Sequence, residues 1–237
     1  MDTENGVQSK KLSGASYHIR TFHVSMNLLS HILVGIIVGI NLIFVFRLPT
    51  PLSATPQHIV LCVLGFQLLM AEAILSLSPY NTWSLHLKLV DKRRAHTVLQ
   101  IVGSVLAIVG SFIKIMDKHN NPNAVNWDTL HGIFGLIALV FTVASLINGV
   151  TSLYAHELRR YLPSKLSKIT HICFGIVVFV AANISLCYGF EKNMFRNWIS
   201  TTNNGPVVNT LITFTALLTG IVVVAPLITF FQKFKTN

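Results

Sequence analysis

Six long apolar stretches constrain the fold of this sequence more than any other feature. Each has about 20 residues or more, the length that an α-helix needs to cross the hydrocarbon core of a bilayer, about 30 Å thick. They cover residues 24–46, 58–78, 95–116, 129–153, 168–190 and 206–231. The breaks between them contain Pro, Asn and charged residues, which interrupt helices. The sequence therefore predicts an all-α membrane protein with six transmembrane helices in one domain, residues 1–237.

The composition and the placement of charge agree with this fold and orient it. Hydrophobic residues make up 52% of the chain and charged residues only 11%, which excludes a soluble protein with an ordinary charged surface. The eighteen Lys and Arg lie between the apolar stretches, so we expect no nucleic acid as a partner. The N-terminal tail, the second-to-third loop, the fourth-to-fifth loop and the C-terminal tail hold thirteen of them, and the opposite side holds five. Because cytoplasmic loops retain positive charge, both termini are predicted to be cytoplasmic.

Four histidines stand where a bilayer tolerates them poorly. An imidazole at membrane depth is costly unless it is paired or coordinated. His58, His96, His131 and His171 lie near the starts of the second to fifth predicted helices, in that order. Successive helices run in opposite directions, so His58 and His131 share a depth near the non-cytoplasmic face. His96 and His171 share a depth near the cytoplasmic face.

Two imidazoles on facing helices, at each of two depths, are the ligand set that two haems require. A haem iron takes one axial ligand from each side of its macrocycle, and helix bundles commonly provide such sites. A glycine follows each histidine by four or seven residues on the same helix face, where it would let a flat ring approach the backbone. These glycines are Gly65, Gly103, Gly135 and Gly175. Membrane helices also use glycine for packing, so the glycines only support the hypothesis.

Two other interpretations of the histidines remain open. Each histidine could be an isolated polar residue that joins two helices. Alternatively, the chain could be a metal-ion transporter with imidazole ligands inside the membrane. A path for divalent cations usually includes carboxylates at mid-depth, and only Glu72 and Glu191 lie within or beside the spans. This scarcity favours a cofactor over a transport path.

At these residues the sequence resembles the cytochrome b561 family, six-helix membrane proteins with two non-covalent b-type haems. The resemblance covers nearly the whole chain, and four ligands in register make it specific. It rests on the segments Gln57-His58-Ile59-Val60-Leu61, Ala95-His96-Thr97-Val98-Leu99-Gln100, Leu130-His131-Gly132-Ile133-Phe134-Gly135 and Lys168-Ile169-Thr170-His171. The segment Met70-Ala71-Glu72-Ala73, followed by Ser78-Pro79, looks most like the branch called cytochrome b561 domain-containing protein 2.

The resemblance implies an activity and its partners. It implies a transmembrane oxidoreductase that passes electrons from cytosolic ascorbate, through two haem b groups, to monodehydroascorbate radical or ferric iron. His58 and His131 would ligate the non-cytoplasmic haem, and His96 and His171 the cytoplasmic one. The implied location is an endomembrane, the endoplasmic reticulum or a vesicle, and a homodimer is compatible with the family. A non-catalytic haem-binding subunit of a larger electron-transfer complex is the third interpretation.

The resemblance also implies residues that contact substrate or haem. Arg94 occupies the place of a basic residue that contacts ascorbate, and Lys165 and Lys168 precede His171 in a similar way. All three also satisfy the positive-inside rule. Asn126 and Trp127 precede His131, where family members contact the haem edge. For Trp127 the preferred interpretation is an interfacial anchor.

Three further residues are singled out without a settled role. His119 lies near a position where some family members have a substrate-contacting histidine. His31 lies about two turns inside the first predicted helix, which favours a packed or hydrogen-bonded role. Glu72 follows His58 by fourteen residues, nearly the same face of a regular helix, so its carboxyl is expected toward the cytoplasmic haem. It would serve either in proton coupling or as a neutral acid that ties helices together. An arginine that some members carry late in this helix is missing.

Overall fold

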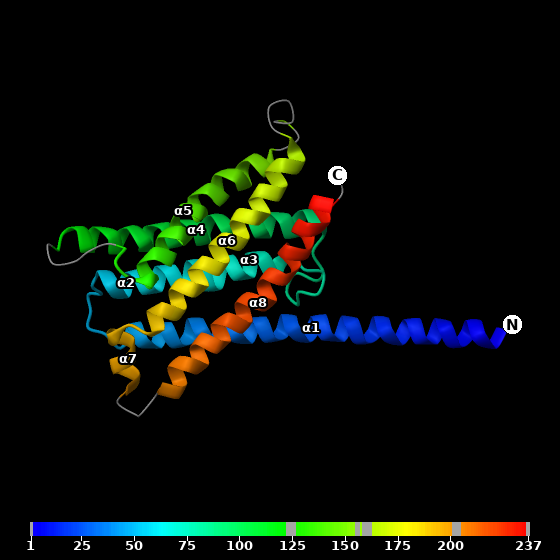
Figure 1. Cartoon of the computed structure of the whole chain (residues 1–237), viewed down its shortest axis with the longest axis horizontal. Helices are drawn as coiled ribbons and strands as arrows, with labels where there is room; N and C mark the ends of the chain where they lie inside the picture. Colours follow the sequence, from blue (N-terminus) through cyan, green and yellow to red (C-terminus); the bar gives the residue numbers. More distant parts are fainter. Residues whose placement is uncertain (1, 122–126, 155–156, 158–162, 201–204, 236–237) are drawn as a thin grey trace.

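The computed structural model is built of helices and connecting loops (Figure 1). It describes the chain except residues 1, 122–126, 155–156, 158–162, 201–204 and 236–237. Across the described residues there is no β-strand, and six helical segments are long and apolar enough to cross a membrane. The structure thus confirms the predicted fold class, an all-α multi-pass membrane protein.

The helices extend beyond the apolar stretches that predicted them. The first, α1, covers Asp2–Phe46, well before the apolar stretch that begins at residue 24. In Figure 1 its N-terminal end reaches past the rest of the bundle. The other long helices are α4 (Leu89–His119), α5 (Leu130–Leu153), α6 (Ser164–Phe190) and α8 (Gly205–Lys235). Polar flanking residues continue these helices because helical backbone hydrogen bonds do not depend on hydropathy.

The second membrane span is irregular in a way that the sequence does not predict. It comprises α2 (Ala54–Cys62), the π-helical segment η1 (Val63–Met70) and α3 (Ala71–Ser76). The junction residues Val63 and Ala71 have α-helical dihedral angles, so the three segments form one continuous rod, called here the second rod. A π-helix has i→i+5 hydrogen bonds and wider turns than an α-helix. Side chains beyond η1 therefore point in other directions than a regular helix predicts.

A short helix, α7 (Asn193–Ser200), connects α6 to α8 and was not expected from the apolar stretches. Its Phe195 and Ile199 are buried, at positions i and i+4 of one face. Phe195 packs against Phe44 of α1, with ring centroids 5.1 Å apart. This amphipathic helix covers the end of the bundle that the sequence predicts to be non-cytoplasmic.

The six spans form a central ring of four with two helices outside it. The second rod packs on α4, α4 on α5, α5 on α6, and α6 returns to η1, so the ring closes. α1 and α8 pack on each other and on the outside of this ring, α1 against the second rod and α8 against α6. The first residues of α1 and the last residues of α8 lie toward the same end in Figure 1. The four ring elements are the ones that carry the four candidate histidines.

The middle of the ring is filled by small and apolar side chains. Phe66 and Met70 of η1 meet Ala107 of α4, Ala138 of α5 and Val178 of α6 in one buried cluster. On every one of these helices the cluster lies between the two levels at which the histidines are found. It therefore forms an apolar layer that separates the two levels.

Candidate functional site

The structure brings the four histidines together as two pairs. The rings of His58 and His131 have centroids 6.2 Å apart and planes at 90°. The rings of His96 and His171 repeat this geometry, with centroids 6.2 Å apart and planes at 88°. All four side chains are half-buried. Each pair joins elements that are diagonal in the ring, the second rod with α5 and α4 with α6.

Backbone carbonyls fix the orientation of three of these rings. The Nδ1–H of His58 donates to the carbonyl oxygen of Gly110 at 2.9 Å, and that of His96 to Ala73 at 2.9 Å. The Nδ1–H of His131 donates to the carbonyl oxygen of Ser185 at 2.8 Å. Metal-ligating histidines typically donate their second ring nitrogen in this way, which fixes the tautomer. In all three rings Nε2 is left without the proton and is free to bind a metal ion.

These hydrogen bonds are reciprocal between neighbouring ring elements. The second rod carries His58 and supplies the Ala73 carbonyl to His96, while α4 carries His96 and supplies the Gly110 carbonyl to His58. Gly110 follows His96 by fourteen residues, so the two levels are about 21 Å apart at 1.5 Å per residue. The second rod and α4 thus each hold a histidine at one level and a supporting carbonyl at the other.

The fourth ring, His171, is supported differently. Its Nδ1 is buried and has no hydrogen-bond partner among the described residues. The carbonyl of Ser145 lies toward it, outside hydrogen-bond geometry. Gly149 of α5 lies against the ring, where a Cβ would be 3.2 Å from Cε1 of His171. A buried, unpaired ring nitrogen is costly, and the protein holds the His171 ring less firmly than the other three because it offers this nitrogen no hydrogen bond.

Side-chain hydrogen bonds tie α5 to α6 beside His171. Asn148 donates to the hydroxyl of Thr170 at 2.7 Å, and the hydroxyls of Ser152 and Ser167 lie 2.8 Å apart. In the membrane such contacts hold helices at a fixed spacing. They hold α5 and α6 together at the His171 level.

The pairs fit one iron atom each. A bond from a metal to an imidazole nitrogen is about 2.0–2.1 Å long, so two opposed imidazoles hold their nitrogens about 4 Å apart. In an imidazole, the ring centroid lies about 1 Å from each ring nitrogen. Centroids 6.2 Å apart therefore leave about 4 Å between two opposed nitrogens, as one iron atom requires. The donor set also fits, because two neutral imidazoles are the axial ligands expected for a haem that transfers electrons. The residues present are therefore suited to haem iron at both levels.

The glycines that follow the histidines do not all have the expected role. Gly65 and Gly103 face each other, and a Cβ on Gly65 would lie 2.7 Å from the carbonyl oxygen of Gly103. This pair serves close packing of the second rod on α4, so the expectation of room for a flat ring is wrong there. Gly135 lies near Ser185, whereas a Cβ added to Gly175 would meet nothing within 4 Å. Only Gly175 therefore leaves open space.

A cavity of about 220 Å³ opens beside the His58 and His131 level. Its lining includes His131, Tyr188, Glu191 and Lys192. Lys192 donates to the hydroxyl of Thr129, the residue that also caps α5. Tyr188 and Lys192 were not singled out from the sequence, because they precede and follow the end of α6 without a recognisable motif. The cavity gives a solute access to one edge of this level.

The loop before α5 is partly described. Asn126 lies outside the described residues. Trp127 has a positive φ of 64° and is 38% exposed, as an interfacial side chain would be. Asp128 pairs with Lys118 at 3.2 Å, and this ammonium lowers the pKa of the Asp128 carboxyl. The ion pair anchors the loop to the end of α4, where His119 is exposed.

The basic residues expected at the cytoplasmic level are exposed. Arg94 pairs with Asp91 at 3.1 Å, one turn away on the same helix. Lys165 and Lys168 are exposed near the start of α6. Lys168 lies close enough to Lys233 of α8 for their charges to interact.

Two basic residues that were not singled out from the sequence belong to this level. Lys233 interacts electrostatically with Arg93 as well as with Lys168, and its charge also acts on His171. These three cations come from α4, α6 and α8 and are called here the basic rim. Only the folded chain brings α8 to this level, so a sequence motif could not have found Lys233.

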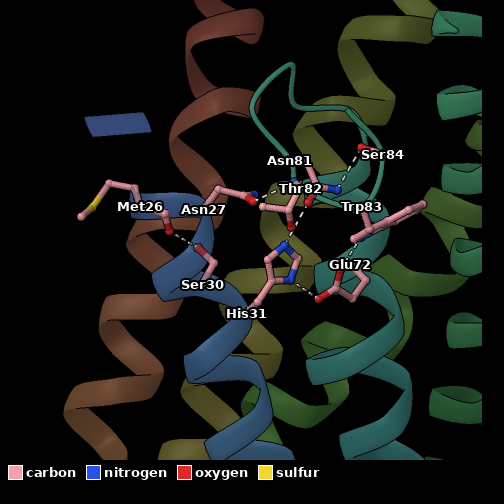
Figure 2. Close-up of polar contacts among 9 residues, drawn as sticks. All are labelled: Met26, Asn27, Ser30, His31, Glu72, Asn81, Thr82, Trp83 and Ser84. Carbon is pink, nitrogen blue, oxygen red and sulfur yellow. Dashed lines mark hydrogen bonds and ion pairs between the residues drawn. The ribbon is translucent and has the colours of Figure 1, made fainter. Parts of the chain in front are cut away.

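His31 and Glu72 form a contact of their own. His31 is hydrogen-bonded through both ring nitrogens, to Glu72 and to Asn81, which agrees with the hydrogen-bonded role expected for it (Figure 2). Glu72 lies next to Ala73, at the depth of His96, but its carboxyl is turned toward α1. The expectation that it shares a face with His58 is wrong, because η1 interrupts the regular helix between them.

The described residues give little support to the interpretation as a metal-ion transporter. They contain no group of three or more His, Cys, Asp or Glu side chains placed to hold a metal ion. The histidines stand in pairs across the ring instead. Pairs at two depths match the geometry of axial ligation better than that of a cation path.

Comparison with known proteins agrees with this geometry. The family model of eukaryotic cytochrome b561 matches residues 57–196, which include all four histidines. The chain is 33% identical over 164 residues to transmembrane reductase CYB561D2 of Mus musculus, covering 69% of this chain and 71% of the relative. It is 33% identical over 166 residues to the Bos taurus protein of the same name, covering 70% and 72%. The human protein of that name is 34% identical over 148 residues, covering 62% and 66%. The chain therefore belongs to the eukaryotic cytochrome b561 family, membrane proteins that bind b-type haem and transfer electrons across the bilayer.

Proposed function

We propose that this chain holds two haem b groups and carries electrons from cytosolic ascorbate to monodehydroascorbate radical or ferric iron on the other side of the membrane. One observation carries the proposal: the two histidine pairs have the same centroid spacing, 6.2 Å, at two levels of one bundle. His58 and His131 would hold the non-cytoplasmic haem, and His96 and His171 the cytoplasmic one. Relatives of this chain are named transmembrane reductases, which supports electron transfer as its function.

The protein groups determine what a bound haem does here. A haem iron with two imidazole ligands supplies one-electron chemistry and has no open position for oxygen. The three backbone carbonyls hold the imidazoles in one tautomer, so the ligands need no reorganisation between oxidation states. The apolar layer around Phe66 and Ala107 excludes water between the levels. Substrates then need to reach only the edge of each site.

The basic rim supports ascorbate as the cytoplasmic donor. Ascorbate is an anion at neutral pH, and a cluster of cations concentrates anions at a site. Arg93, Lys168 and Lys233 come from three helices that meet at the His171 level. Arg94 and Lys165 add positive charge on the same side. The cluster is also compatible with pairing to haem propionates.

The cavity beside His131 supports an acceptor site at the other level. Monodehydroascorbate radical and common ferric chelates are anionic, and Lys192 presents an ammonium at the cavity wall. Glu191 at the same wall is paired with Arg196, which offsets its charge. A small anion can therefore approach the edge of this level without meeting an unpaired carboxylate from Glu191.

The proposed direction of electron transfer requires a particular topology. Both termini would lie on the cytoplasmic side, and the whole chain would form one domain. An electron that moves outward across a membrane that is negative inside gains about 2.3 kcal/mol per 100 mV, so such a potential assists this direction.

Haem analysis of single variants tests the proposal. Pyridine haemochrome assay of pure wild-type protein should give two haems per polypeptide. His58→Ala and His131→Ala should each lose the same spectral component, and His96→Ala and His171→Ala the other. His86→Ala, an exposed loop histidine, serves as the control and should retain both. Loss of one shared component in His58→Ala and His96→Ala would contradict the pairing.

A vesicle assay separates electron transfer from the two other interpretations. Vesicles that contain only this chain should reduce a trapped ferric chelate when ascorbate is added outside, in the orientation that exposes the basic rim. A haem-binding subunit that needs other proteins would load haem but leave the chelate oxidised. A metal-ion transporter would move the metal without showing b-type haem bands.

A further inference from the structure

A second polar cluster lies between α1 and the second rod, outside both histidine pairs (Figure 2). Nδ1 of His31 lies 2.7 Å from Oε1 of Glu72, and Nε2 of His31 lies 2.9 Å from Oδ1 of Asn81. The indole Nε1–H of Trp83 donates to Oε2 of Glu72 at 2.9 Å. One imidazole and one carboxyl, both partly buried, are thus hydrogen-bonded within a cluster of groups from α1, α3 and the loop that precedes α4.

The hydrogen bonds around this cluster fix almost every proton in it. The hydroxyl of Ser84 donates to the carbonyl of Ser76 at 2.8 Å, so its oxygen accepts from Nδ2 of Asn81 at 3.0 Å. This sets the orientation of the Asn81 amide, whose Oδ1 must face His31 as an acceptor. Nε2 of His31 therefore carries a proton. The indole of Trp83 is only a donor, so Oε2 of Glu72 is an acceptor.

Only the contact between Nδ1 of His31 and Oε1 of Glu72 is left undetermined. One proton shared there satisfies both atoms, either as imidazolium with carboxylate or as imidazole with carboxylic acid. Without that proton two lone pairs would face each other at 2.7 Å, a separation that only a hydrogen bond permits. The geometry therefore describes a pair that holds one proton and that must open if the proton leaves.

The pair lies beside the support of a haem ligand. Glu72 precedes Ala73, whose carbonyl accepts the Nδ1–H of His96 at 2.9 Å. Among the described residues, Glu72 is the one charged group that acts appreciably on His31. The proton thus sits close to the cytoplasmic level without belonging to either histidine pair.

The titratable groups on the neighbouring elements have other contacts. The ammonium of Lys92 on α4 donates to the Ser78 carbonyl at 2.8 Å. His23, two turns before His31 on α1, stacks on Tyr80 with ring centroids 4.8 Å apart. Both groups therefore have their contacts away from the His31–Glu72 pair, which joins α1 to α3.

We propose that His31 and Glu72 form a proton site whose occupancy is coupled to the electron at the His96–His171 level. The inference rests on the proposed function. An electron that arrives at this level adds one negative charge, and one proton taken up between Nδ1 and Oε1 compensates it. Ascorbate monoanion loses one electron and one proton when it forms its radical anion, so the donor supplies both. When the electron passes to the other level, the proton returns to cytoplasmic water.

Glu72→Gln is a sharp test because it keeps the hydrogen bonds. The Gln oxygen accepts from Trp83, and its NH₂ group donates to Nδ1 of His31, while Nε2–H of His31 still donates to Asn81. The variant removes the exchangeable proton and leaves a fixed, neutral network. His31→Gln is the second variant and removes the imidazole instead.

The measurement is a spectroelectrochemical titration of the full chain with its haems, repeated across the neutral pH range. In wild type, the reduction equilibrium at the His96–His171 level should change by up to about tenfold per pH unit, about 59 mV for one electron. In Glu72→Gln and His31→Gln it should be independent of pH. Redox-difference infrared spectra should show a carboxyl band in wild type that Glu72→Gln lacks.

Two control variants separate proton coupling from a structural effect. Trp83→Phe removes a hydrogen bond but keeps the proton site, so its pH dependence should match wild type. Asp117→Asn removes an exposed carboxyl at the other end of α4 and should also match. Equal pH slopes in wild type and Glu72→Gln, or a lost slope in Trp83→Phe, overturn the inference. Wild-type protein without two haems, or without reduction by ascorbate, would instead contradict the proposed function.

Discussion

Replacing Gly65 by Ala tests whether one contact positions both histidine levels. The new Cβ would lie 2.7 Å from the Gly103 carbonyl oxygen, 2.9 Å from the Ala107 nitrogen and 3.0 Å from the Ala107 Cβ. All three obstacles are backbone atoms or a Cβ, which cannot rotate away. The second rod and α4 must therefore separate by several tenths of an ångström.

The expected cost follows from two opposing effects. Overpacking of a well-packed interior costs about 1–3 kcal/mol, and Ala gains about 1 kcal/mol over Gly inside a helix. Because three atoms obstruct the methyl group of Gly65→Ala, we expect a net loss of about 1–2 kcal/mol. Gly39→Ala on α1 is the matched control, since nothing lies within 4 Å of its Cβ position. The control should gain about 0.5–1 kcal/mol in free energy of unfolding, so the two variants should differ by about 1.5–3 kcal/mol.

The same separation should disturb haem binding at both levels. The hydrogen bonds from His58 to Gly110 and from His96 to Ala73 both cross the interface between the second rod and α4. The assay is thermal unfolding in one detergent, followed by circular dichroism and by haem absorption. Gly65→Ala should unfold earlier than Gly39→Ala and should lose both spectral components together. Equal melting of the two variants would refute the reasoning.

Three further predictions concern single features of the site. Lys168→Gln combined with Lys233→Gln should slow reduction by ascorbate about tenfold at low salt, and the difference from wild type should shrink as salt screens the basic rim. Gly149→Ala places a Cβ 3.2 Å from Cε1 of His171, so haem content at that level should fall while the other level is kept. Asp128→Asn removes an exposed ion pair, so wild type should have a small advantage in melting temperature at neutral pH. This advantage should vanish as the pH falls through the lowered pKa of Asp128, because a depressed carboxyl pKa stabilises only above it.

The membrane spans and the histidine levels follow from the sequence for simple physical reasons. Span length is set by bilayer thickness, so apolar stretches of about 20 residues locate the helices. Antiparallel alternation of successive helices places His58 with His131 and His96 with His171, and the structure brings the same rings together. Their role as axial ligands stays a prediction until haem is measured. The limits of each helix were less predictable, since α1 begins far outside its apolar stretch.

The supporting groups could not be predicted from residue types. Every residue has a backbone carbonyl, so nothing in the sequence distinguishes Gly110, Ala73 or Ser185 as the acceptors for histidine. Lys233 joins Lys168 only because α8 packs on α6. Such groups are selected by tertiary packing, and they become visible only when the helices are placed.

One irregularity, η1, relates the two levels to the His31–Glu72 pair. In α4 and α6 the histidine and the supporting carbonyl of the same helix are fourteen residues apart. These are His96 and Gly110 in α4, and His171 and Ser185 in α6. In the second rod the corresponding residues, His58 and Ala73, are fifteen residues apart. A π-helical turn absorbs an additional residue while keeping the helix continuous. Each added residue rotates the following side chains by about 100°, which turns the residues after η1 away from the face that His58 occupies. η1 thus keeps the Ala73 carbonyl in register with His96 and also directs the Glu72 carboxyl toward α1. The His31–Glu72 pair therefore exists because the second rod is not a regular helix.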